Sequence, residues 1–142
     1  LELAAEYLVM AAMLAEINAT AAELAGQPGL ANIAAQLKAG AAALENATDW
    51  IIANYVDNAP TVHAGSVPFL WLTGTVTGGW LLAKSAAIAA QRLAAGDADP
   101  YYTAKIATAE YFATHQLPFA AAYAAEVTGG GASVFALPEN LF

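Results

Sequence analysis

The chain has 142 residues and a mass of 14.5 kDa, which is enough for one domain. Hydrophobic residues make up 59% of it, but many are alanines, which are strong helix formers, so the composition predicts an all-α protein. A net charge of −8 disfavours binding to nucleic acid or to an anionic membrane surface. The absence of cysteine excludes disulfides and zinc–thiolate sites, and we expect a cytoplasmic protein.

The first half of the sequence predicts two amphipathic helices. The first runs from Leu1 to about Ala25, and because the chain begins within it, without a methionine, we expect a piece of a longer protein. A turn at residues 26–29 leads to a second helix from Leu30 to about Tyr55, whose apolar spacing is close to a heptad repeat. Gly40 is its weakest point, since a glycine costs about 1 kcal/mol in a helix.

A short loop through His63 is expected to lead into a central helix from Ser66 to Gly96. This stretch has no charge between Val67 and Ala83, but its glycines and threonines weaken the case for a membrane span. We interpret it as a core helix buried over most of its circumference, with Ser66 as its N-cap and Gly96 at its end. No second stretch of the sequence suggests a membrane span.

Gly74 and Gly78 of this helix lie four residues apart and therefore share one face. Small residues at this spacing allow a neighbouring helix to approach closely, so we expect these two glycines to mark a tight contact.

The last predicted helix begins with a clear signal, Asp99 as N-cap and Pro100 in the first turn, and runs to about Thr128. Pro118 should kink it, and the glycines at 129–131 should end it. The final residues form a short tail whose apolar anchors are Val134, Phe135, Leu137 and Phe142.

These elements predict an antiparallel up-down-up-down four-helix bundle with a short C-terminal tail. Residues 1–25 form a linking helix that is part of the bundle, and residues 26–142 form the remainder of one compact domain.

The sequence contains little that indicates chemistry. Di-iron bundles need Glu-x-x-His pairs, but Pro60 and Phe112 stand three residues before His63 and His115. The glycines at 129–131 follow a helix and lack the residues of a phosphate-binding loop. We therefore predict no catalytic, cofactor-binding or metal-binding residue, with His63 in a loop and His115 at a helix boundary.

Two stripes are expected on the last helix. A smooth one is a core face, formed by Ile106, Ala109, Ala113, Ala120, Ala124 and Val127. A second one mixes aromatic and polar groups, which suits either a protein–protein contact or burial within the bundle through the kink at Pro118. Its members are Tyr101, Lys105, Thr108, Phe112, His115 and Phe119.

Several short motifs carry a resemblance to a known family. They are Val67-Pro68-Phe69-Leu70, Gly78-Gly79-Trp80-Leu81-Leu82-Ala83-Lys84, Tyr102-Thr103-Ala104-Lys105-Ile106-Ala107-Thr108-Ala109, Leu117-Pro118 and Ala136-Leu137-Pro138. From about Ala31 onward the chain resembles the extra C-terminal helical domain of bacterial acyl-CoA dehydrogenases of the 3-methylmercaptopropionyl-CoA dehydrogenase type. These motifs are structural, so they identify a domain and not a substrate.

The resemblance implies a parent flavoprotein that uses FAD to oxidise an acyl-CoA to the enoyl-CoA, as in fatty acid metabolism. The family's catalytic carboxylate and flavin contacts lie upstream, so none maps onto Glu110, Glu126 or any other residue here. We expect this fragment to be non-catalytic and free of cofactor, and to pack on the catalytic body or a second subunit of a homo-oligomer. The alternative is a self-standing helical interaction or oligomerisation module.

Overall fold

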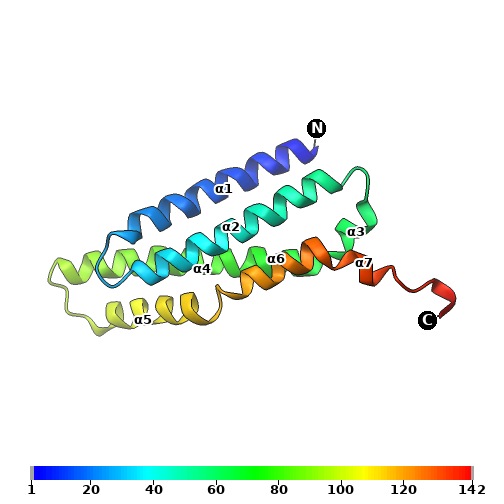
Figure 1. Ribbon diagram of the computed structural model, residues 1–142. Coiled ribbons are helices and arrows are strands. Elements are labelled where there is room, and N and C mark those ends of the chain that lie inside the picture. The colour runs from blue at the N-terminus through cyan, green and yellow to red at the C-terminus, as the bar shows by residue number, and fades with distance from the viewer. Residues whose placement is uncertain (1, 142) are drawn as a thin grey trace.

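The computed structural model describes residues 2–141, with side chains described from Tyr7 to Leu141. This part of the chain contains helices and no strand, which confirms the all-α prediction. In Figure 1 the long helices lie side by side along a common direction, and short helices gather at one end. The elements are α1 (Glu2–Ala25), α2 (Ala31–Asn54), α3 (Ala59–Ala64), α4 (Ser66–Ala94), α5 (Pro100–His115), α6 (Phe119–Gly129), α7 (Gly131–Val134) and the 3₁₀ turn η1 (Glu139–Leu141).

Two helices, α2 and α4, form the centre of the packing. Helix α2 contacts α1, α4, α5 and α6, and α4 contacts those same neighbours in turn, while α5 and α6 follow each other along one side (Figure 1). Large apolar side chains from α1, α2 and α4 fill the core, and alanines fill most of the space between α4, α5 and α6. Fully buried examples are Ile17, Leu24, Leu37, Leu44, Leu72 and Val76.

The local signals at the start of α5 are confirmed. Asp99 is the N-cap, and its side chain accepts a hydrogen bond from the backbone N–H of Tyr101 at 2.9 Å, with Pro100 opening the helix. Gly96 follows the end of α4 with φ +88, a conformation that glycine adopts at low cost.

Helix α4 begins at Ser66 as predicted, but the assignment of Ser66 as its N-cap is wrong. Ser66 is the first residue within the helix, its hydroxyl donates to the His63 carbonyl at 2.8 Å, and Gly65 occupies the cap position. The segment before it is the short helix α3, which contains His63, and not a loop. Gly65 allows the α3–α4 junction to approach α6 closely, because a Cβ there would lie 3.1 Å from the Val127 carbonyl oxygen.

Helix α4 is buried on one face and not over most of its circumference. Leu72, Val76 and Ala83 point into the core, whereas Leu70 and Leu81 on the opposite face are well exposed. The neighbouring helices cover one side of α4, so its other side stays exposed although most of its residues are apolar. Composition alone therefore overstated the burial of this helix.

The chain does not kink at Pro118 but breaks there. Helix α5 ends at His115, the Leu117 N–H bonds back to the Phe112 carbonyl at 3.1 Å, and α6 starts at Phe119. Proline lacks an N–H and clashes with the preceding turn, so the helix stops before it and restarts after it. The break leaves Leu117 pointing into the core, where it is 2% exposed.

Leu117 packs against glycines other than the predicted pair. A Cβ at Gly79 of α4 would lie 2.7 Å from Leu117 Cδ2, and one at Gly40 of α2 would lie 3.3 Å from the same atom. In contrast, a Cβ at Gly74 would meet nothing within 4 Å, and one at Gly78 would make an ordinary contact of 3.4 Å with Phe112. The expected tight contact at Gly74 and Gly78 is therefore wrong, and Gly40 is a packing site instead of a weak point.

The C-terminal glycines also pack closely. Helix α6 ends at Gly129, and α7 begins at Gly131, which is buried against α3. A Cβ at Gly131 would overlap the Thr61 side chain and lie 3.2 Å from the Thr61 Cα. The glycine run therefore ends one helix and allows the next to contact α3.

The predicted tail anchors do not contact the core. Val134, Phe135 and Leu137 are each more than half exposed, because α7 turns the chain away from the long helices (Figure 1). Phe142 lies outside the described residues.

Within the described residues, one segment is long and apolar enough to cross a membrane by length and composition. It is Tyr7–Ala25 of α1, near the N-terminus, and 22% of it is buried. The expectation that no second stretch suggests a membrane span is therefore wrong by this measure. The segment is rich in alanine, and its only charged residues are Glu16 and Glu23.

A paired substitution tests the glycine contact. We expect Gly79→Ala to be less stable than Gly74→Ala by about 1–3 kcal/mol, because only the Cβ at position 79 must displace Leu117 from a filled core. Both variants gain the same helix propensity, so their difference isolates packing. Urea unfolding of the two variants measures it, and equal midpoints would contradict the contact.

A second pair tests the α3–α7 contact. Gly131→Ala should destabilise the chain through the clash with Thr61, whereas Gly129→Ala places its Cβ in open space and should be tolerated. Thr61→Ala should restore part of the stability of Gly131→Ala by removing the nearest atom. Thermal unfolding of the three variants checks this, and a melt of Gly131→Ala matching that of Gly129→Ala would refute it.

Candidate functional site

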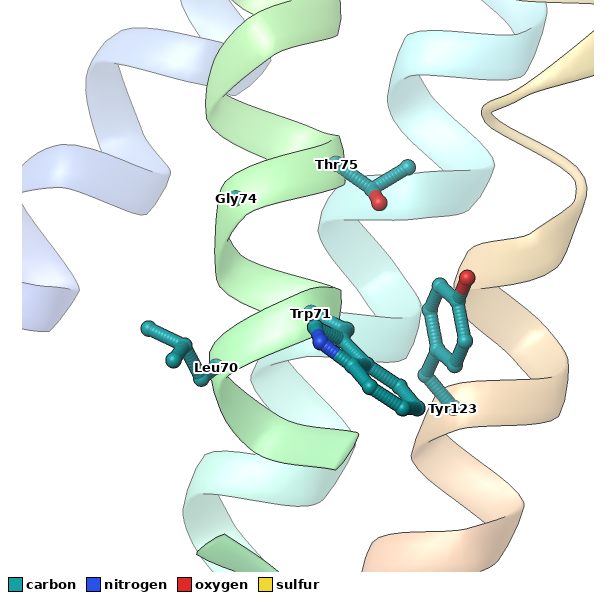
Figure 2. Close-up of a pocket in the computed structure, with 5 residues that line it drawn as sticks. All are labelled: Leu70, Trp71, Gly74, Thr75 and Tyr123. Atoms are coloured by element: carbon teal, nitrogen blue, oxygen red, sulfur yellow. The ribbon is translucent and has the colours of Figure 1, made fainter. Parts of the chain in front are cut away.

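A shallow aromatic groove lies between α4 and α6, as Figure 2 shows. Its volume is about 490 Å³, and its lining consists of Leu70, Trp71, Gly74, Thr75 and Tyr123. The Trp71 and Tyr123 rings extend toward each other from the two helices, with centroids 5.8 Å apart, and Leu70 points away from them (Figure 2).

The groove continues along α6 as an aromatic row. Phe119 stacks on Tyr123 with ring centroids 6.4 Å apart, and both Phe119 and Trp71 are about half exposed. The groove offers an indole N–H, a phenol and one threonine hydroxyl, without any charged group in its lining. Such a surface can hold an apolar or aromatic group from a partner, but it contains no acid–base pair.

A second, smaller pocket of about 180 Å³ lies between α1 and α2. Apolar side chains, including Tyr7, Met10 and Leu14, form one part of it, and Glu45 and Asp49 form another. The lining carries no cation, so this pocket does not suit a phosphate or a carboxylate ligand.

The predicted stripe of aromatic and polar residues is divided by the break at Pro118. Tyr101 is exposed at 57% and carries Lys105 Nζ at 5.3 Å from its ring centroid, while Phe112 packs against the core. Phe119 instead belongs to the aromatic row of α6. The smooth stripe is the core face that was predicted, with Ala109, Ala113, Ala120 and Val127 buried.

Neither histidine lies in the arrangement of a catalytic base, in which a partner side chain holds the imidazole ring in place. His63 lies exposed in α3 with its ring 5.8 Å from the Tyr55 ring, and His115 ends α5 with its ring 4.5 Å from that of Tyr111. Among the described residues, no three His, Asp or Glu side chains come together as a metal site would require.

Of the acidic residues, Glu110 makes cross-helix contacts. Its carboxylate accepts hydrogen bonds from Asn32 of α2 and from Thr114, and Asn32 also donates to the Thr114 hydroxyl at 3.1 Å. This network joins α2 to α5, so the role of Glu110 is structural. Glu126 is exposed on α6.

Among the described residues, Tyr102 has a shifted pKa. Partial burial raises the pKa of Tyr102 above its ordinary 10.0, and the nearby Asp97 carboxylate raises it further, while Arg92 opposes the shift. The phenol thus stays neutral at physiological pH, and the fold would lose stability at this turn only as the pH rises above 10.0, where the unfolded phenol ionises.

Comparison with known proteins identifies the family. The family described as "Acetyl-CoA dehydrogenase C-terminal like" matches residues 13–138, and this match begins within α1. The chain therefore belongs to that family of acyl-CoA dehydrogenase C-terminal domains, as its resemblance predicted.

Two curated proteins share part of this sequence. A 3-methylmercaptopropionyl-CoA dehydrogenase of Ruegeria pomeroyi is 38% identical over 119 residues, which cover 83% of this chain and 20% of that protein. A broad-specificity linear acyl-CoA dehydrogenase of Mycobacterium tuberculosis, FadE5, is 43% identical over 60 residues, 40% of this chain and 10% of that protein. The chain thus spans about a fifth or less of the relatives it matches.

The groove was missed because its two walls come from residues 71 and 123, and no local pattern connects them. Val67, Gly74, Leu81 and Ile88 recur at heptad intervals on α4, but of these four residues only Gly74 lines the groove. The whole helix was expected to lie in the core, whereas the structure leaves these four residues exposed.

A cross-helix hydrogen bond gives a further prediction. Trp80 Nε1 of α4 donates to Thr20 Oγ1 of α1 at 2.9 Å, and both residues are half-buried. Thr20→Val should lower the free energy of unfolding by about 1 kcal/mol, because the indole N–H of Trp80 loses its acceptor in a partly buried site. Thr108→Val is the control, since the Thr108 hydroxyl only donates back to the Ala104 carbonyl. Equal denaturation midpoints for the two variants would contradict the role of this bond.

Proposed function

We propose that the chain is the non-catalytic C-terminal domain of a cytoplasmic, FAD-dependent acyl-CoA dehydrogenase. In this proposal the domain is an antiparallel four-helix bundle in which α5 and α6 together occupy the place of one helix. Its work is to pack on the catalytic body or on a second subunit. The observation that carries the proposal is the family match over residues 13–138.

The linings of the two pockets described above bear on where the flavin would bind. A flavin dinucleotide needs cations or free backbone N–H groups at its pyrophosphate, but neither lining contains Lys or Arg, and the smaller one presents two carboxylates. These linings do not fit the flavin. In the proposal, the polypeptide that precedes this domain would hold the FAD, which would supply the hydride-accepting chemistry of acyl-CoA oxidation there.

A self-standing interaction module is the second candidate. The exposed aromatic groove of Trp71, Phe119 and Tyr123 favours a contact role, which both candidates share. They differ in whether the same polypeptide contains a dehydrogenase.

The full-length protein that contains this chain distinguishes the candidates. We expect it to purify yellow, with a flavin absorption spectrum, and to reduce a dye acceptor only when an acyl-CoA is added. A colourless full-length protein with no acyl-CoA-dependent reduction would favour the interaction module.

Substitutions in the same protein test the non-catalytic role. We expect His115→Ala, Glu110→Gln and Glu126→Gln to keep flavin-reduction rates within a few-fold of the parent. The loss of a general acid or base typically lowers a rate about 10²–10⁴-fold, so a loss of that size in any of them would contradict the proposal. Stopped-flow flavin absorbance measures the rate directly.

A further inference from the structure

The side of α4 that faces away from the core is apolar along the length of the helix. Val67, Leu70, Trp71, Leu81 and Ile88 are 54%, 68%, 52%, 56% and 57% exposed. We call this surface the outer face of α4; its members are Val67, Leu70, Trp71, Gly74, Leu81, Lys84, Ile88 and Arg92. Large apolar groups gathered at heptad intervals on an exposed helix face are typical of a seam that receives another helix.

Gly74 lies within this face and has no function inside the chain. A Cβ there would meet nothing within 4 Å, yet a glycine in a helix interior costs about 1 kcal/mol relative to alanine. Because Leu70 and Trp71 stand beside it, Gly74 forms a low point in the seam at the edge of the aromatic groove. Such a low point lets a second backbone approach closely.

The charges on α4 restrict what can cover it. The helix Ser66–Ala94 contains Lys84 and Arg92 and no acidic residue, although the whole chain carries a net charge of −8. Both residues are exposed, and Lys84 Nζ lies 4.8 Å from the ring centroid of Trp80 at the edge of the outer face. If two copies paired through this face, the cations of one copy would meet no α4 carboxylate of the other, and in a parallel pair the like charges would also come together. An apolar helix flanked by acidic residues would complement the face much better.

The length of the relatives indicates which part of the protein would supply such a helix. The chain corresponds to 20% of the Ruegeria pomeroyi dehydrogenase, and the matching family describes C-terminal domains. Most of a protein of that length would therefore precede this chain, which supplies a large surface on the same polypeptide.

We propose that the outer face of α4 docks on the polypeptide that precedes this chain, against a helix whose carboxylates lie opposite Lys84 and Arg92. This inference rests on the proposed function in treating the chain as the C-terminal part of a longer dehydrogenase. It selects α4, and not the tail or α5, as the docking element.

Photo-crosslinking of the full-length protein tests the docking. The photoreactive residue p-benzoylphenylalanine replaces Leu81, and the irradiated protein is analysed by denaturing gel and peptide mass mapping. We expect a product of monomer mass in which position 81 is joined to a peptide from the preceding polypeptide. A covalent dimer would overturn the proposal in favour of a second copy, and the absence of any product would show that the face is open to solvent.

The same photoreactive group in place of Tyr111 is the matched control. Tyr111 is 62% exposed on α5 and lies outside the outer face. We expect no intrachain product from this position, and capture equal to that from position 81 would overturn the choice of α4.

Charge reversal provides a second readout. Arg92→Glu should lower the crosslinking yield from position 81 severalfold by placing like charges across the contact, while Lys38→Glu, an exposed change on α2, should leave it unchanged. An unchanged crosslinking yield for Arg92→Glu would contradict the proposed acidic partner helix.

Flavin content and acyl-CoA-dependent dye reduction, measured on the same preparations, separate the docking proposal from the proposed function. A colourless protein that crosslinks from position 81 refutes the dehydrogenase alone, and a yellow active one that does not crosslink refutes the docking alone.

Discussion

The packing of this domain depends on the position of Leu117 between two glycines. The side chain enters the core where α5 gives way to α6, and it contacts α2 at Gly40 and α4 at Gly79. A Cβ at Gly79 would overlap this side chain and one at Gly40 would lie 3.3 Å from it, so both positions favour glycine. One side chain thereby fixes α2, α4 and the α5–α6 pair relative to one another, and it does so because Pro118 interrupts the helix directly after it.

Alanine shapes the rest of the molecule. Its small side chain lets α4, α5 and α6 pack closely through Ala83, Ala109, Ala113 and Ala120, but each contact buries little apolar area. Larger apolar residues such as Leu81 and Ile88 are then left on the outside, which is unusual for a domain with no role in contact. The composition that made the chain easy to recognise as helical is also the reason why its surface is so apolar.

The features predicted correctly from sequence are local ones. Asp99, Pro100 and Gly96 act through the backbone within one helical turn, so their types and order were sufficient. The glycine contacts were assigned to the wrong residues because the face that α4 turns inward is decided by α2 and α5, distant in sequence. Gly79 differs from Gly78 by one position, but that is a rotation of about 100° around the helix. The groove between Trp71 and Tyr123 was beyond local patterns for the same reason.

Helix α1 lies along one side of the other long helices (Figure 1). Of the segment Tyr7–Ala25, 22% is buried, and its contacts are mainly with α2, supplemented by the Trp80–Thr20 hydrogen bond to α4. Local unfolding free energies follow the amount of buried contact, so α1 should open and close many times for each global unfolding event. The helix would fray from its N-terminal turns while Leu117 and its neighbours stay packed.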